Sequence, residues 1–193
     1  MKTLYYLTLA ILIGLPAAAS AHGPTRQKVE ETITITAPTD EVWKIVGDFS
    51  GLHNWHPAVK STRMEGDKVR VLTLAGEGEP TITEELKKLD DDNMMMKYKI
   101  IDMSVVNSVA YRGKQYDVPV LPVNNYLSII KVIPVEGGSE VTWTGKFYRV
   151  YMLNYDTSEP RYPEGLGDKE AAETIRSVYR SGLDNLKTLV EGG

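Results

Sequence analysis

Two histidines three positions apart, His53 and His56, are the first candidates for chemistry in this sequence. Imidazole nitrogens bind zinc and copper, but a structural zinc site takes four protein ligands and the chain contains no cysteine. A third histidine, His22, lies far upstream, and no spacing brings it to the other two. A simpler role is structural: Trp55 packs over the mouth of a cavity while His56 shapes the turn. We therefore predict no metal site.

Acid–base or nucleophilic catalysis would need paired groups, and the sequence offers few. Tyr98, Asp102, Tyr111, Arg112 and Tyr116 are the polar residues expected near the wall of an interior cavity. No two of them have a spacing that marks a catalytic pair. The sequence also lacks a nucleophile-elbow motif, a glycine-rich phosphate loop and a dinucleotide fingerprint. We predict no catalytic residue and no cofactor.

Two helical segments are expected to position these residues. Apolar residues at 42, 45, 46 and 49 follow an i, i+3, i+4, i+7 pattern, which predicts an amphipathic helix after Pro38. A glycine break and a second short helical turn then bring Trp55 and His56 to a loop edge. From Asp168 to Val190 the apolar residues recur with helical period again. At 1.5 Å per residue this helix is roughly 35 Å long, enough to cross a sheet.

The remaining segments alternate with the period of two that is typical of strands. Turn-forming clusters at 65–68, 90–93 and 136–139 join them into antiparallel hairpins. The sequence predicts an α+β helix-grip fold, a curved antiparallel sheet of about seven strands around a long C-terminal helix, with two short helices after the first strand. The expected strands are Thr32–Thr36, Val59–Met64, Val69–Ala75, Thr81–Leu89, Met94–Met103, Tyr126–Val135 and Val141–Tyr151.

A curved sheet that grips one helix leaves a cavity unless large side chains fill it. Alternate residues of a strand share one face, and methionine adapts to irregular apolar space. Core packing without a cavity remains the alternative for any one of these side chains. We predict that a ligand cavity is lined by Met94, Met96, Tyr98, Ile100, Tyr126, Trp143, Phe147, Ile175 and Tyr179.

The first residues have the pattern of a secretory leader. A weakly basic start is followed by the apolar run Leu4–Leu15 and by the small-residue cleavage site Ala19-Ser20-Ala21. The run is too short to span a bilayer, which takes about 20 residues. We expect a signal peptide over 1–21, a flexible tail over 22–28 and a single domain over 29–193. The absence of cysteine excludes a lipoprotein anchor and disulfides, so an exported protein of this kind fits a bacterial periplasm.

The charge balance excludes some partners. The chain has 22 Lys and Arg against 26 Asp and Glu, a net charge of −4, and the predicted leader would remove only Lys2. Nucleic acids and anionic membranes bind basic surfaces, so we expect no nucleic-acid partner and no membrane anchor.

Two segments lack a clear strand or helix pattern, 104–125 and 153–167. Long loops in a compact domain are commonly functional, and exposed tyrosine and arginine are favoured at protein interfaces. We predict that Trp55, His56, Arg161 and Tyr162 form the cavity mouth or contact a partner. A solvated connection before the last helix is the alternative for the second loop.

Several short segments resemble a known superfamily, the SRPBCC proteins, also called START-like or Bet v 1-like, which include relatives of polyketide cyclases. More closely, the chain resembles MxaD-type periplasmic proteins associated with bacterial methanol oxidation. The segments that carry the likeness are Val46-Gly47-Asp48-Phe49, Trp55-His56-Pro57-Ala58, Val69–Leu74, Val141-Thr142-Trp143 and Gly182–Leu186.

The resemblance implies a non-enzymatic accessory protein that assists methanol dehydrogenase and its cytochrome c partner. It supplies no agreed catalytic set. Two alternatives stay open: a carrier of a small hydrophobic ligand in the helix-grip cavity, and a cyclase- or aromatase-like enzyme.

Overall fold

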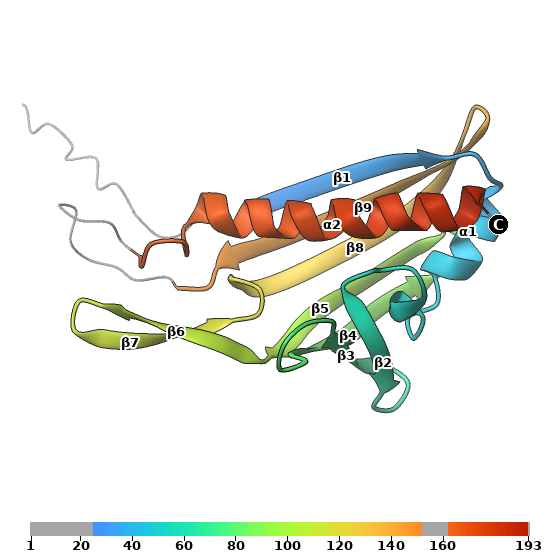
Figure 1. Ribbon diagram of the computed structural model, residues 1–193. Coiled ribbons are helices and arrows are strands. Elements are labelled where there is room, and N and C mark those ends of the chain that lie inside the picture. The colour runs from blue at the N-terminus through green and yellow to red at the C-terminus, as the bar shows by residue number, and fades with distance from the viewer. Residues whose placement is uncertain (1–24, 152–161, 193) are drawn as a thin grey trace, which may run out of the picture.

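The computed structural model describes residues 25–151 and 162–192. It contains one curved sheet, one long helix against it and two short helical segments (Figure 1). In chain order the elements are β1 (Gln27–Ile35), α1 (Thr39–Val46), the 3₁₀ turn η1 (Leu52–Asn54), β2 (Val59–Met64), β3 (Val69–Leu74), β4 (Thr81–Asp90), β5 (Met95–Met103), β6 (Val105–Tyr111), β7 (Lys114–Pro119), β8 (Val123–Val135), β9 (Gly138–Arg149) and α2 (Asp168–Glu191).

The main sheet has seven strands in the order β1-β9-β8-β5-β4-β3-β2, and every neighbouring pair is antiparallel. α2 lies along β1 and β9, while β5 to β2 turn below it (Figure 1). α1 and η1 follow β1, and α1 lies beside the C-terminal end of α2 (Figure 1). The predicted α+β helix-grip fold is confirmed. Antiparallel neighbours explain it, since each turn cluster joins adjacent strands.

α1 is short because its ends are set by packing. Val42 and Val46 are buried as the sequence periodicity predicts, Ile45 of the same pattern is only partly buried, and Trp43, outside the pattern, is buried as well. The Trp43 indole Nε1–H donates to Asp91 Oδ1 at 2.9 Å, which ties α1 to the turn between β4 and β5. A side chain at Gly47 would lie 2.6 Å from the Trp43 ring, so the helix ends at a residue without Cβ.

α2 begins where a buried arginine meets its first residue. Arg149 Nη1, on β9, lies 3.0 Å from both carboxylate oxygens of Asp168. An acidic residue in the first helical turn also interacts favourably with the helix dipole. The face of α2 toward the sheet buries Ala171, Ile175, Tyr179, Gly182, Leu183 and Leu186. Leu189, predicted on the same stripe, is 46% exposed, whereas its neighbour Val190 packs against the core.

The segment 104–125 is not a loop, and this corrects the sequence prediction. It contains the two-stranded sheet β6–β7, which extends from the body of the domain (Figure 1). Arg112 and Gly113 join the strands with φ of 50° and 73°. Positive φ at both central residues is the pattern of a type I′ hairpin turn, for which Asn-Gly is the usual signal. Arg-Gly carries that signal weakly, so the hairpin was missed.

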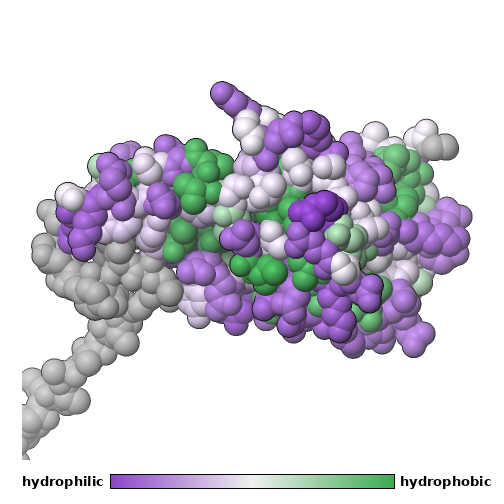
Figure 2. Space-filling model, turned by 90° about the horizontal axis from the view of Figure 1, so that it is seen from below, coloured by the Kyte–Doolittle hydropathy of each residue, from purple (hydrophilic) through white to green (hydrophobic). Residues whose placement is uncertain are grey.

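The hairpin exposes apolar side chains. Most of β6 is exposed, and its first two residues, Val105 and Val106, are 57% and 52% exposed. On the face seen from below, separated apolar patches interrupt a mainly hydrophilic surface (Figure 2).

The first strand begins earlier than predicted. β1 starts at Gln27, which lies opposite Phe147 of β9. Residues 27 and 28, predicted in the tail, are therefore part of the sheet.

We predict that Gly182→Ala destabilises the domain. A Cβ at this position would lie 2.5 Å from His56 Cδ2 and 3.1 Å from Trp143 Cζ3. Alanine improves helix propensity by about 1 kcal/mol, but overpacking two rings should cost more, so the free energy of unfolding should fall by about 1–3 kcal/mol. Urea titration measures it. The exposed neighbour Ser181→Ala is the control, with a change within about 0.5 kcal/mol. Unchanged or increased stability of Gly182→Ala would contradict this close packing.

Candidate functional site: an apolar cavity beside the long helix

A cavity of about 70 Å³ lies between η1, the sheet and α2. Most of its wall is apolar, and the polar side chains on it are His56, Glu84, Tyr98, Tyr126 and Trp143. Four wall residues are partly or largely exposed, which marks the side nearest solvent: Ala58, Leu74, Ile100 and Val178. The remaining wall residues are Leu52, Val59, Leu72, Ile82, Leu121 and Ile175.

Stacked rings fill the space next to this cavity. Trp143 on β9 stacks on Tyr179 of α2 with ring centroids 4.4 Å apart and an interplanar angle of 11°. The Trp55 ring packs against Trp143 at 5.5 Å. These three side chains are all buried, so the stack removes much of the volume that a wider cup would leave open.

A hydrogen-bond network runs behind the stack. The Trp143 indole N–H donates to Ser128 Oγ at 2.8 Å and lies 3.0 Å from the Tyr98 hydroxyl oxygen. Ser128 in turn donates to the Thr144 carbonyl, and the Tyr126 and Tyr179 hydroxyls lie 2.5 Å apart. Burial raises the pKa of the phenols of Tyr98, Tyr126 and Tyr179 well above their usual range. These phenols therefore stay protonated at neutral pH and hold the sheet and α2 together.

His56 is a buried connector with both ring nitrogens in use. Its Nε2 lies 3.1 Å from the carbonyl oxygen of Val178 on α2, and its Nδ1 accepts the Ala58 backbone N–H at 3.2 Å. Together these partners require the neutral ring with the proton on Nε2. Burial lowers the pKa of His56, and the hydrogen bond to Val178 opposes that shift. The ring thus joins the turn after η1 to the middle of α2.

The most unusual feature of the wall is a buried ion pair. Arg70 on β3 and Glu84 on β4 are direct cross-strand partners, and both are buried. Arg70 Nε donates to Glu84 Oε2 at 2.7 Å, and Nη1 donates to the Phe49 carbonyl at 2.6 Å. Nη2 also lies 2.7 Å from Oε2, although it has no well-aligned hydrogen bond.

Aromatic rings complete the surroundings of this arginine. The guanidinium carbon lies 4.2 Å from the centroid of Phe49 and 5.0 Å from that of Tyr98, as in a cation–π contact. Burial raises the pKa of the Glu84 carboxyl, while the Arg70 charge opposes that shift. Removing one partner of such a pair typically costs about 3–5 kcal/mol, because the other charge is left buried and alone.

The structure brings together only part of the predicted cavity. Tyr98, Ile100, Tyr126, Trp143 and Ile175 line it. The other four predicted wall residues pack elsewhere: Met96, Phe147 and Tyr179 are buried in the core beside it, and Met94 lies in the turn before β5 with a φ of 45°. The period-two pattern correctly identifies inward side chains, but it cannot say which of them are covered by α2.

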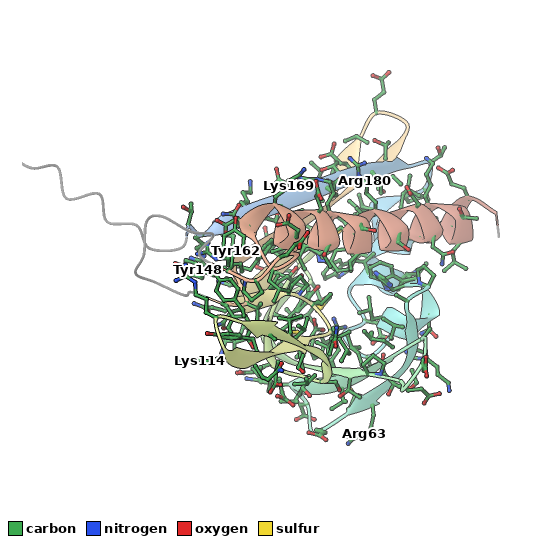
Figure 3. All side chains as sticks on the ribbon, turned by 60° about the vertical axis from the view of Figure 1, so that its left-hand side comes forward. Arg63, Lys114, Tyr148, Tyr162, Lys169 and Arg180 are labelled. Carbon is green, nitrogen blue, oxygen red and sulfur yellow. The ribbon has the colours of Figure 1, made fainter. Side chains whose placement is uncertain are left out.

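The predicted mouth residues need correction. Trp55 and His56 are only 2% and 3% exposed, so neither offers a surface to a partner protein, and His56 is part of the cavity wall. Helix α2 covers them: Asn185 of α2 donates to the Trp55 carbonyl oxygen at 2.9 Å. Tyr162 lies at the end of the molecule where α2 begins (Figure 3). Arg161 lies outside the described residues.

Tyr162 borders a second hollow, separate from the apolar cavity. It is larger, about 580 Å³, but open to solvent, and its wall includes the acidic residues Glu164 and Glu170. The ring of Tyr162 also packs on the Arg149 guanidinium, 4.9 Å from its carbon. We regard the smaller cavity as the candidate site, because its wall is almost entirely apolar and binding sites for small molecules are lined mainly by apolar side chains.

Arg70 and Glu84 were missed as site residues, although the sequence carries a signal for them. Arg70 shares a strand face with Leu72, and Glu84 shares one with Ile82. A charged residue on the apolar face of each of two adjacent strands indicates a buried pair, since an unpaired buried charge is too costly.

Metal binding and membrane crossing can be assessed within residues 25–151 and 162–192. No group of three His, Cys, Asp or Glu side chains in these ranges could hold a metal ion. His53 is exposed, and its ring pairs with the Thr62 hydroxyl at 3.1 Å. His22 lies outside the described residues. In the same ranges, the structure contains no helix whose length and apolar character would let it cross a bilayer.

We predict that acid destabilises the domain through His56. Because its folded-state pKa is lowered below the unfolded value of 6.5, the unfolded chain binds a proton that the native chain does not. Stability should therefore be complete above about pH 6.5 and fall as pH drops below it, with a slope of at most about 1.4 kcal/mol per unit.

Chemical unfolding of wild type and His56→Gln measures this effect. The titration runs from about pH 7.5 to about pH 5.5, because these values lie about one unit on either side of the free imidazole pKa of roughly 6.5. The variant should lose that part of the slope, whereas the exposed His53→Gln control should keep it. Identical slopes in wild type and His56→Gln would mean that another group senses the pH.

Comparisons with known proteins agree with this architecture. A family model described as polyketide cyclase/dehydrase and lipid transport matches residues 26–191. No curated protein matches the chain. The structure of the protein XoxI from Bacillus cereus is similar with a TM-score of 0.65 and 26% identity, over 84% of this chain and 94% of that one.

Two more distant structures share the fold. Ara h 8.0201 is 15% identical, with a TM-score of 0.61, over 88% of this chain and 100% of its own. The ZhuI aromatase/cyclase from a Streptomyces species is 19% identical, with a TM-score of 0.56, over 87% and 93%. The SRPBCC resemblance is thus confirmed at the level of the superfamily. Since the family model covers nearly the whole described domain, the chain belongs to the polyketide cyclase/dehydrase and lipid transport family.

Proposed function

We propose that this protein binds a small apolar ligand in the cavity between η1, the sheet and α2, and that it does so without catalysis. The observation that carries the proposal is a mainly apolar cavity, open to solvent on one side, in which each polar side chain on the wall has at least one hydrogen-bond partner in the fold. His56 bonds to α2 and to Ala58, Glu84 to Arg70, and Trp143 to Ser128 and Tyr98. A general acid or base has to reach the substrate, and groups held in this way serve the fold first.

The size of the cavity argues against the cyclase alternative. Drug-sized ligands occupy pockets of about 300–1,000 Å³, and a cyclase would have to hold a polyketide chain of at least that size. The present cavity has about 70 Å³. An engineered cavity of about 150 Å³ holds benzene, so this one has room for roughly three or four non-hydrogen atoms. A larger ligand would require α2 or η1 to move.

Xenon provides a direct test, because it enters dry apolar cavities and needs no polar contact. Xenon under pressure should shift the methyl NMR signals of Leu72, Ile82 and Ile175 with a saturable dependence. Ile82→Phe should reduce the effect several-fold by filling the space, at a stability cost of about 1–3 kcal/mol. Leu86→Phe, on the same strand but away from the cavity wall, is the matched control. Shifts that fail to saturate, or that spread over the surface, would refute ligand binding here.

The accessory role in methanol oxidation is a second candidate, and one observation favours it. The β6–β7 hairpin exposes Val105 and Val106, and the nearby Ile101 on β5 is 46% exposed. Exposed apolar side chains on a projecting element are typical of protein contact surfaces. Together with the sequence likeness to MxaD-type proteins, this supports docking on methanol dehydrogenase or cytochrome c in the periplasm, where the predicted leader would deliver the chain.

We expect the substitution of Val105 and Val106 together by Thr to weaken binding to methanol dehydrogenase at least about tenfold. Each substitution replaces a methyl group of the apolar contact by a hydroxyl group. Threonine keeps the β-branched shape, so the hairpin should persist. Leu89→Thr, at a 42% exposed position on β4, is the control for general loss of surface apolarity. Titration of the wild-type chain into the dehydrogenase and into cytochrome c, at several salt concentrations, measures the association. If neither protein binds, the accessory role is refuted, while ligand binding is judged by the xenon experiment.

A further inference from the structure

The cavity wall contains one polar atom that the fold leaves unused. Both close contacts between Arg70 and Glu84 fall on the same carboxylate oxygen, Oε2. The other oxygen, Oε1, has no hydrogen bond with any described residue. In the described chain, the fully enclosed side-chain atoms without a partner are Trp55 Nε1 and Arg70 Nη2. Oε1 of Glu84 is not one of them, so it is not fully enclosed. Since Glu84 is 5% exposed and lines the cavity, this oxygen is open to the cavity.

An open acceptor in an apolar cavity calls for a donor. A water molecule needs two to four polar partners to be held well, and takes about 30 Å³ of volume. Here the cavity of about 70 Å³ is larger than one water, and its other polar side chains already have hydrogen-bond partners in the fold. A ligand with one donor and an apolar body would satisfy Oε1 and fill the remaining space.

The charge of the ligand follows from the ion pair. Glu84 is the one charged side chain among the described wall residues, and Arg70, buried beside it but off the wall, balances its charge. A cationic ligand would add an unbalanced charge to this apolar space, and an anion would be repelled by the carboxylate.

We propose that the cavity selects a short neutral ligand with a hydrogen-bond donor, a small alcohol, and that Glu84 Oε1 accepts that donor. This inference rests on the proposed function, because it assigns the chemical class of the ligand bound in the same cavity. Arg70 acts through Glu84: it orients the carboxylate so that Oε2 is occupied and Oε1 is free. The volume limits the ligand to roughly three or four non-hydrogen atoms, as for the apolar probe.

Two probes with the same skeleton test the donor. 2-Propanol and acetone have equal numbers of non-hydrogen atoms, but acetone can only accept hydrogen bonds. Both are titrated into the protein while the methyl signals of Leu72, Ile82 and Ile175 are followed by NMR. We expect 2-propanol to bind at about millimolar concentration, as befits so small a ligand, and acetone at least about tenfold more weakly. Isopropylammonium, the cationic analogue, should not bind.

Variants separate the carboxylate from general cavity effects. Arg70→Met combined with Glu84→Leu replaces the pair by apolar residues of similar size, which proteins commonly tolerate. In this double variant the preference for 2-propanol over acetone should disappear, while xenon still binds. Should the variant fail to fold, the comparison of the two probes in the wild-type chain still decides.

The outcomes distinguish this inference from the function on which it rests. Equal affinities for 2-propanol and acetone would overturn the donor assignment and leave apolar binding intact. If xenon binds but neither 2-propanol nor acetone does, the donor assignment is likewise overturned and apolar binding stands. A preference for 2-propanol that survives the double variant would overturn the role of Glu84. Failure of xenon as well as both probes would refute the proposed function itself.

Discussion

The stack of Trp143 on Tyr179 is the contact on which the rest of the domain depends. It joins the middle of β9 to the middle of α2, with ring centroids 4.4 Å apart. Because the rings are parallel and close, α2 must approach the sheet closely, and Gly182 lies one turn farther along the helix where only a hydrogen fits. The helix position in turn decides how much of the cup is filled. The cavity is the space that this packing leaves beside η1.

Polar groups in this core are tolerated because they are connected. Trp143, Ser128 and Tyr98 share hydrogen bonds, and the hydroxyls of Tyr126 and Tyr179 meet at 2.5 Å. An unsatisfied polar group in the same place would cost about 1–3 kcal/mol. A network of this kind also restricts motion, because each side chain is held from more than one direction. The apolar cavity is thus framed by rigid polar connections, which suits a preformed binding site better than a cup that closes around a large ligand.

Within its family, this chain combines a nearly filled cup with a projecting hairpin. A family described by polyketide cyclases, dehydrases and lipid transport uses one fold for different purposes, so fold alone does not decide between them. Here the small cavity favours a small ligand, while the exposed valines of β6 favour a protein contact. The two features lie on different elements, so both functions fit one molecule.

The sequence alone determined the architecture, because periodicity is a local property. The pattern at 42–49, the strand alternation and the stripe on α2 each follow from which residues face the core, and each was predicted without knowledge of distant contacts. The inward faces of β5 and β9, with Tyr98 and Trp143, were correct for the same reason. The hairpin β6–β7 was missed because its Arg-Gly turn lacks the usual asparagine.

Only the tertiary structure decided which inward residues border empty space. Burial of Trp55 and His56 depends on α2, more than a hundred residues away in the sequence, and no local pattern records that contact. The pairing of Arg70 with Glu84 depends on the register between β3 and β4, since a shift of one residue would place one of them on the opposite face. The free oxygen of Glu84 depends on the angle at which Arg70 approaches. Local sequence determines which face of an element each residue lies on, whereas the volume left between packed elements depends on the relative positions of all of them.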